Sequence, residues 1–240
     1  MSTEHTAAPA IADMSEQMQI RLEKRAKLIE SGREAYPVGL LDSEGNRVEP
    51  NHIEDLRAEY DPKLAAEELK AGDETDRVVH VGGRVVFVRN TGKLCFATLQ
   101  GGTEGKRIQA MLSLAEVGEE SLAEWKSLVD LGDHVFVTGR VIVSRRGELS
   151  IMVTDWKMAS KALRPMPVLH KDLNEETRVR QRYLDLMVRE EARELVKKRA
   201  LITRTVRRVL EDHGYIEVET PVLQLVHGGA TARPFRTHLN

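Results

Sequence analysis

The stretch RVVHVGGRVVFVRNTGKLCFATLQ, residues 77–100, decides the fold of the chain. Apolar and polar residues alternate along it, and this period of two predicts β-strands with one buried face. Asn-Thr-Gly-Lys, residues 90–93, separates two such runs and predicts a hairpin turn. Gly82 and Gly83 interrupt the first run at a point where a long strand would need to bend. The stretch therefore predicts a bent first strand that is connected by a tight turn to a second strand.

Three more strand-like runs follow, RIQAMLS (107–113), DHVFVTGRVIVS (133–144) and ELSIMVTDWKM (148–158). Residues 119–129 have a helical pattern, which places a helix between the third and the fourth of five strands. This is the order of elements in an OB-fold barrel. We therefore expect a five-stranded OB-fold barrel over residues 73–160, a fold that binds oligonucleotides or oligosaccharides.

Helices are expected before the barrel. Residues 1–14 are small and polar and include a proline, which is typical of a disordered tail. Residues 15–72 are interpreted as a helical extension, whose first helix has Ser15 as its cap and stops near Gly32. The extension ends in two short helical pieces, Ile53–Tyr60 and Lys63–Ala71.

The segment after the barrel leads into a second domain. Residues 161–186 are punctuated by proline and predict a linker, within which a helix begins that covers residues 175–187. A longer helix is expected over residues 190–213, ending at Gly214, and a short strand is expected to run into Pro221. The longer helix carries an apolar stripe at helical spacing, formed by Ala192, Leu195, Ile202, Val206 and Val209.

Composition indicates a soluble globular protein of a reducing compartment. The 240 residues are 41% apolar and 31% charged, with a net charge of −2 and a single cysteine, Cys95. One cysteine excludes an internal disulfide framework, and no secretory signal or membrane-spanning run is present, so a cytoplasmic location is expected. Charge is uneven, because residues 178–208 hold eleven Lys or Arg and four Asp or Glu. No Cys/His cluster has the spacing of a zinc site, and no metal ligands are predicted.

Strand alternation gives the barrel a polar outer face on which Phe96, Gln109 and Glu148 lie. An aromatic ring on such a face predicts a platform for an unpaired base. The Gln109 amide matches the acceptor and donor of a uracil edge, and an ionised Glu148 is an acceptor. Arg84 and Arg89 in the first strand are candidate partners of phosphates or base oxygens. The ordinary alternative is a phenylalanine packed under a loop, with the polar residues simply solvated.

Several strings in the sequence resemble one enzyme family. GYIEVETPVL, residues 214–223, resembles motif 1 of the class II aminoacyl-tRNA synthetases, and an OB-fold before motif 1 is the layout of the subclass for aspartate, asparagine and lysine. The detailed resemblance is to the bacterial lysyl-tRNA synthetases and covers residues 15 to 240. It is carried by the collinear strings TGKLCFATLQ, RRGELSI, KALRPMP, RVRQRYLDL and VETPVLQ with GGATARPF.

This resemblance implies an ATP- and Mg²⁺-dependent ligase that activates lysine and transfers it to tRNA(Lys). The barrel would bind the anticodon, and residues 187–240 would begin an α+β catalytic domain with an antiparallel sheet. Gly228 and Gly229 would border the lysine pocket, whereas Gly214 and Pro221 belong to motif 1, which forms the homodimer. Motifs 2 and 3, with the ligands of ATP and Mg²⁺, would lie beyond residue 240. No catalytic residue is therefore assigned, and the 240 residues alone are expected to be inactive.

Three interpretations remain open at this point. The first is the N-terminal part of a lysine–tRNA ligase, and the second is a stand-alone, non-catalytic OB-fold module that binds nucleic acid. The third is another ligase of the same subclass.

One position departs from the family pattern, because Val88 stands where a second arginine beside Arg89 is expected. With one arginine fewer, the first strand is expected to bind phosphates or bases less strongly than in the family.

Overall fold

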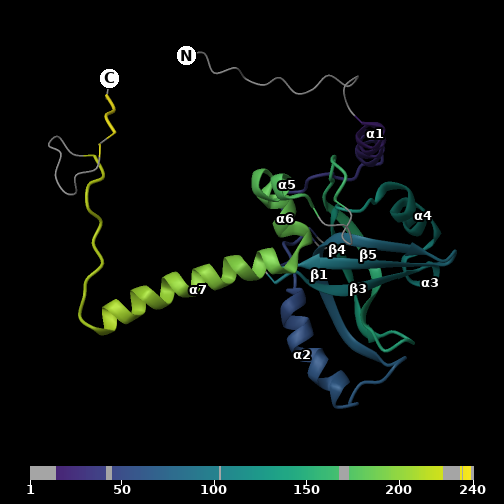
Figure 1. Cartoon of the computed structure of the whole chain (residues 1–240). Helices are drawn as coiled ribbons and strands as arrows, with labels where there is room; N and C mark the ends of the chain where they lie inside the picture. Colours follow the sequence, from purple (N-terminus) through teal and green to yellow (C-terminus); the bar gives the residue numbers. More distant parts are fainter. Residues whose placement is uncertain are drawn as a thin grey trace. The chain divides into compact units, whose positions relative to one another are not determined.

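The computed structural model describes residues 15–41, 45–102, 104–167, 173–223, 233 and 235–238. The chain divides into two compact units, Met1–Glu194 and Leu195–Asn240. A closed five-stranded barrel lies at the centre of the first unit, with helices packed around it (Figure 1).

The barrel has the strand order β1-β2-β3-β5-β4, in which β1 also pairs with β4 and closes the sheet. All pairs are antiparallel except β3 with β5, which is parallel. The strands are β1 (Glu74–Asn90), β2 (Leu94–Gly101), β3 (Lys106–Ser113), β4 (His134–Val143) and β5 (Leu149–Ser160). This arrangement confirms the OB-fold prediction, and all five strands lie where the alternation predicted them.

The inner face of the barrel is filled by the alternate residues that the sequence pattern indicated. Cys95, Ala97 and Leu99 of β2 are completely buried, as are their counterparts in β3 and β5. Two short helices, α3 (Leu114–Val117) and α4 (Glu119–Leu128), lie between β3 and β4. The sequence pattern predicted α4 and missed α3. Trp125 of α4 packs edge-on against Trp156 of β5, with ring centroids 5.1 Å apart, so α4 joins the barrel core.

Glycines allow close contacts inside the sheet. A Cβ on Gly82 would lie 2.9 Å from the Phe136 ring, and one on Gly83 would lie 2.9 Å from the Leu99 side chain. Gly139 is tighter still, because a Cβ there would lie 2.0 Å from the Met152 carbonyl oxygen. The glycine pair in β1 therefore serves the packing of a strongly curved strand, as the sequence predicted.

A β-bulge in β1 resets which residues face the core. Val85 pairs with Leu99 and Phe87 pairs with Thr98, so Val86 is an extra residue in the strand. Val85 is completely buried and Val88 also packs against the core, although the two are three positions apart. As a result, the odd-numbered residues that follow the bulge, beginning with Phe87, face outward.

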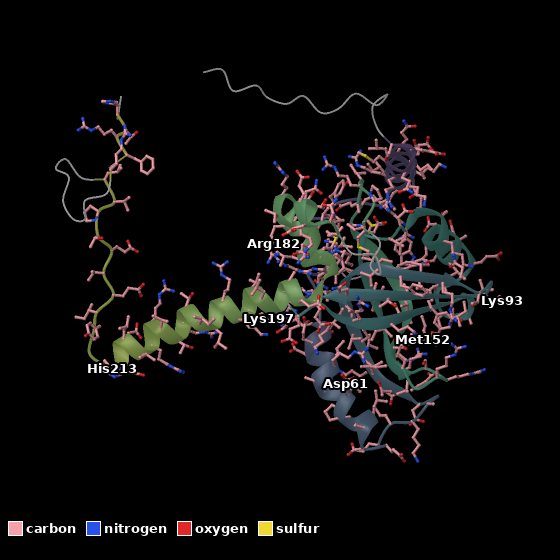
Figure 2. The ribbon with its side chains drawn as sticks, in the orientation of Figure 1. Asp61, Lys93, Met152, Arg182, Lys197 and His213 are labelled. Atoms are coloured by element: carbon pink, nitrogen blue, oxygen red, sulfur yellow. The ribbon has the colours of Figure 1, made fainter. Side chains whose placement is uncertain are left out.

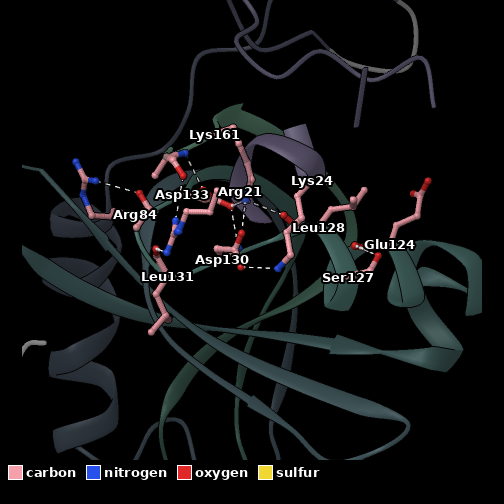
Figure 3. A network of polar contacts seen from close by, with 12 residues as sticks. Arg21, Lys24, Arg84, Glu124, Ser127, Leu128, Asp130, Leu131, Asp133 and Lys161 are labelled. Atoms are coloured by element: carbon pink, nitrogen blue, oxygen red, sulfur yellow. Dashed lines mark hydrogen bonds and ion pairs between the residues drawn. The ribbon is translucent and has the colours of Figure 1, made fainter. Parts of the chain in front are cut away.

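Helix α1 (Glu16–Glu30) matches the predicted helix and docks through a polar network (Figure 3). Arg21 donates to the carbonyl oxygens of Leu131 and Ala162, at 2.9 and 3.0 Å. The Lys24 ammonium lies 2.6 Å from Asp130, which also contacts Lys161. Ser15 occupies the cap position but makes no side-chain hydrogen bond there. The first helix is thus held by side chains that reach the β4 end of the barrel rather than by its cap.

Three expectations about the helices and strands need correction. The two short helical pieces are one helix, α2 (Ile53–Ala65), with Pro62 in its last turn. Pro62 removes one N–H donor, but its carbonyl accepts from Ala66 at 2.9 Å. The helix ends at Ala65, and Glu67 beyond its cap has a φ of 57°. Residues 63–71 therefore do not form a second helix.

The helix expected over residues 175–187 is divided into α5 (Glu175–Arg180) and α6 (Arg182–Val188). Gln181, with φ −115° and ψ 57°, breaks the helical path. The completely buried carboxylate of Asp185 lies 2.6 Å from both Arg182 and Arg189 and 3.6 Å from Arg178. This cluster of opposite charges stabilises the break, which local sequence preference does not show.

Helix α7 (Glu190–Asp212) ends at Gly214, which has a φ of 83°, as predicted. The described residues after it, up to Leu223, form no strand, so the strand expected before Pro221 is absent from this part of the structure. A strand needs a partner for its backbone groups, and residues 195–240 supply none among those described. In the second unit, Leu195, Ile202, Val206 and Val209 are 45–62% exposed.

Candidate nucleic-acid interface

A groove of about 830 Å³ lies on the outer face of the barrel. Its floor consists of outward-facing residues of β1, β2, β3 and β5, and the turn between β4 and β5 forms one wall. Met152, labelled in Figure 2, lies on β5 and is one of the apolar residues of the floor. The polar and aromatic residues of the lining include Phe87, Arg89, Phe96, Gln109, Arg145, Arg146 and Glu148.

Phe96 lies on the outer face, half-buried, because β2 alternates regularly and its neighbours Cys95 and Ala97 point into the core. Arg89 is paired with Phe96 across the β1–β2 ladder. Its guanidinium carbon lies 4.6 Å from the centroid of the phenylalanine ring, a cation–π contact. The ring and the charge are therefore held together in the open groove.

Gln109 and Glu148 are also brought together, although they are far apart in sequence. The Gln109 Nε2 donates to Glu148 Oε2 at 2.7 Å, and Ser150 Oγ donates to Gln109 Oε1 at 3.3 Å. These two bonds fix the orientation of the amide. Glu148 is fixed by its backbone, which exchanges hydrogen bonds with Ser144 across the β4–β5 turn. The pair presents one amide N–H and one carboxylate oxygen side by side.

The structure adds three residues that the sequence did not indicate. Phe87 is outward because of the bulge in β1, which alternation alone cannot show. Arg145 and Arg146 are exposed in the β4–β5 turn, beside Glu148. The sequence could have indicated this wall of the groove, because two consecutive arginines stand in a predicted turn close to Glu148.

Arg84 is not brought to the groove. It precedes the bulge in β1, is largely buried, and donates from Nη1 to the carbonyl oxygen of Gly132 at 3.0 Å (Figure 3). Burial lowers the pKa of its guanidinium. Across the ladder it faces His134, whose pKa falls to about 4 because of burial and the nearby Arg84 charge. Arg84 is therefore part of the α1 end of the barrel.

The other predicted site residues lie in the second unit or outside the described residues. Gly228 and Gly229 fall outside the described residues. Gly214 ends α7, and Pro221 follows it in the irregular segment. In the described ranges, no three His, Cys, Asp or Glu side chains gather as a metal site would require. Within the same ranges, no helix combines the length and apolar character that a bilayer-spanning segment needs.

Two family models match different parts of the chain. The model of the OB-fold nucleic acid binding domain matches residues 79–159, and the model of class II tRNA synthetases (D, K and N) matches residues 174–240. Residues 79–159 are thus similar to nucleic-acid-binding OB-folds, and residues 174–240 are similar to part of the class II tRNA synthetases.

The chain is also similar to curated lysine–tRNA ligases. Lysine–tRNA ligases of Kineococcus radiotolerans and Mycolicibacterium gilvum are 56% and 54% identical over 95% of the chain. Lysine–tRNA ligase 1 of Mycobacterium tuberculosis is 48% identical over 98%. The chain spans about 43–44% of the length of these relatives. Its similarity to the N-terminal part of lysine–tRNA ligases confirms the family resemblance.

Proposed function

We propose that the chain is the anticodon-binding part and the beginning of the catalytic domain of a lysine–tRNA ligase. The observation that carries this proposal is the hydrogen-bonded pair of Gln109 and Glu148 beside Phe96 in the open groove. OB-fold proteins bind single-stranded nucleic acid by combining aromatic platforms with a positively charged groove. Here Phe96 is the platform, and Arg89 and the turn arginines supply the charge.

The pair gives the groove a preference for a base that has an oxygen acceptor next to a ring N–H. Gln109 keeps one amide N–H for a base oxygen, and the Glu148 carboxylate accepts from a ring N–H. Uracil offers this combination on its O4 and N3–H edge. When a base stacks on the Phe96 ring, it takes the place of the Arg89 guanidinium. The displaced guanidinium then lies beside the phosphate of the nucleotide that carries this base. The groove therefore suits an unpaired uridine of the tRNA(Lys) anticodon.

The rest of the proposal concerns the complete enzyme. Residues 73–160 bind the anticodon, residues 161–186 link the domains, and residues 187–240 begin the catalytic domain. Gly214 and Pro221 belong to its homodimer-forming motif 1, and Gly228 and Gly229 border the lysine pocket. ATP and Mg²⁺ support the activation of lysine in the complete enzyme, on ligands beyond residue 240. The enzyme works in the cytoplasm, where its tRNA is found.

Binding of anticodon stem-loops tests the proposal. The RNAs are the stem-loop of tRNA(Lys) and the same stem-loop with its anticodon uridines replaced by cytidines. Phe96→Ala should weaken binding of the uridine RNA by about 5- to 150-fold, which corresponds to about 1–3 kcal/mol for one stacked base. Glu148→Gln should weaken binding of the uridine RNA and reduce the preference over the cytidine RNA.

A matched control is Glu176→Gln, which makes the same change at an exposed carboxylate of α5. It should leave both affinities unchanged. Equal losses on the two RNAs for Glu148→Gln would contradict base reading by the pair. Full binding by Phe96→Ala would contradict the use of the groove altogether.

A further inference from the structure

We propose that Phe87 is a second stacking platform, and that the groove holds two successive unpaired nucleotides. This inference rests on the proposed function, because it extends the same groove. Among the three phenylalanines of the barrel, Phe96 and Phe136 are half-buried and Phe87 is 54% exposed. Its ring lines the groove together with Phe96, and no buried cluster of the described residues includes it.

The exposure of Phe87 is a consequence of the fold, and it gives up free energy that burial of the ring would contribute. With regular alternation after Val85, Phe87 would face the core, where a phenylalanine contributes about 1.5–3 kcal/mol by burial. The extra residue Val86 turns Phe87 outward and leaves Val88 to pack against the core. β-bulges often redirect a side chain beside a functional site. A bulge that exposes the larger apolar side chain and buries the smaller one points to a use for the ring outside.

The strand register places the Phe87 and Phe96 rings about one nucleotide length apart. Phe87 faces Thr98 across the β1–β2 ladder, and Phe96 is two residues from Thr98 on the same face. Such diagonal neighbours are about 7–8 Å apart. One nucleotide of an extended single strand covers a step of this size, so bases of neighbouring nucleotides reach both rings.

Charge at the step between the rings fits a phosphate. Arg89 is two residues after Phe87 on the same outward face, and it is directly opposite Phe96. Its guanidinium lies over the Phe96 ring and lines the same groove as Phe87. The phosphate that joins the two nucleotides meets this charge, while Arg145 and Arg146 line the same groove.

The two platforms differ in selectivity. Gln109 and Glu148 are paired with each other, and Gln109 lies on β3, which is next to the strand of Phe96 and two strands away from Phe87. Stacking on a phenylalanine face needs no hydrogen bond and accepts any base. The Phe87 position should therefore accept all four bases next to the selected uridine, but it should not accept a nucleotide that has lost its base.

Anticodon stem-loops with single abasic sites test this inference on the 240-residue chain. Phe87→Ala should weaken binding of the intact stem-loop about 5- to 150-fold, whereas Phe87→Tyr should bind like the wild type. An abasic site at one neighbour of the selected uridine should weaken wild-type binding by a similar factor. On that RNA, Phe87→Ala should cause no further loss, and Phe96→Ala should still cause one. Exchange of one base for another at that neighbour should have little effect.

Tyr183→Ala is the matched control, because this aromatic side chain is 55% exposed and does not line the groove. It should bind as the wild type does, and thermal unfolding should show the same midpoint for Phe87→Ala and the wild type. If Phe96→Ala loses binding and Phe87→Ala does not, this inference is wrong and the proposed function stands. If neither loses binding, the proposed function is wrong as well. An equal loss for Phe87→Ala on intact and all abasic RNAs would also overturn the inference, because the ring would then act without a base.

Discussion

Lys161 has a buried ammonium group, and its three N–H bonds match three acceptors. It donates to the Leu128 carbonyl oxygen at 2.8 Å, to Asp130 at 2.6 Å and to Asp133 at 2.7 Å. Burial opposes ionisation of Asp130, but hydrogen bonds from Lys161 and Lys24 outweigh it and lower the pKa of that carboxyl. A satisfied cluster of this kind fixes one arrangement of the residues that hold α1.

Removing the Lys161 charge should leave the buried Asp133 carboxylate without its ionic partner. We expect Lys161→Met to lower the free energy of unfolding by about 3–5 kcal/mol, as is usual when one partner of a buried ion pair is lost. Urea unfolding followed by circular dichroism measures this change. Arg180→Met is the control, since its ion pair with Glu176 is 76–77% exposed. A loss for Lys161→Met no larger than for the control would show that the cluster contributes nothing to stability.

His134 makes stability depend on pH. Its pKa is about 4 in the folded chain, because of burial and the Arg84 charge, against an ordinary value of 6.5. Between these values the unfolded chain binds more protons than the folded chain, so stability falls as the pH drops from about 6.5 to 4. We expect this ring to contribute a loss of about 2 kcal/mol over that window, allowing for its partial exposure.

His134→Asn should remove this contribution, and His52→Gln, at an exposed position, should retain it. Urea unfolding at several pH values between 4.5 and 7.5 compares the three proteins. A variant without His134 that loses stability as steeply as the wild type would contradict the assignment.

At the scale of secondary structure, the strands of the barrel could be predicted from the sequence because each strand buries one face. That burial requires a period of two, and the sequence shows it in all five strands. The bulge at Val86 could not be predicted from the sequence, because it depends on the pairing of β1 with β2. The position of Phe87 in the groove follows from this one extra residue, whereas Arg84 precedes the bulge and contacts Gly132 at the α1 end of the barrel. The break at Gln181 likewise depends on contacts of Asp185 that no local preference encodes.

The β4–β5 turn supplies a further prediction. Arg145 and Arg146 form one wall of the groove, and each phosphate neutralised on a single strand contributes about 0.7 to the salt dependence of log K. If both arginines contact phosphates, Arg145→Gln/Arg146→Gln should reduce the slope of log K against log salt by about 1.4. Fluorescence anisotropy of a labelled anticodon stem-loop between 50 and about 200 mM salt gives the slope.

The matched control, Lys27→Gln/Arg47→Gln, removes the same two charges at exposed sites outside the groove. Its slope should equal that of the wild type. If both double variants change the slope alike, the net charge of the chain governs binding, and the β4–β5 turn has no special part in it.

On the scale of the whole molecule, the two units differ in how much apolar surface they bury. The barrel encloses a continuous core, in which Leu99, Ile108 and Ile151 are completely buried. In the second unit, apolar side chains of α7 and of residues 215–223 are largely exposed. A net charge of −2 conceals a second contrast, between the basic stretch 178–208 and the rest of the chain. Stability therefore has to be considered for each unit separately, whereas the basic stretch belongs to both units.

Amide hydrogen exchange should separate the two units. Strand amides around Leu99 and Ile151 should open only with global unfolding, because their hydrogen bonds are enclosed by the core. Amides of α7 after Leu195 and of residues 215–223 should exchange at least about 100-fold faster, since a helix without a packed apolar face is marginally stable in water. A concentration series from low to high micromolar provides the control, because association through the exposed side chains would slow exchange in α7 as concentration rises. Protection in α7 equal to that of the barrel at the lowest concentration would contradict the separation, since it would require a packing partner for α7 within the same chain.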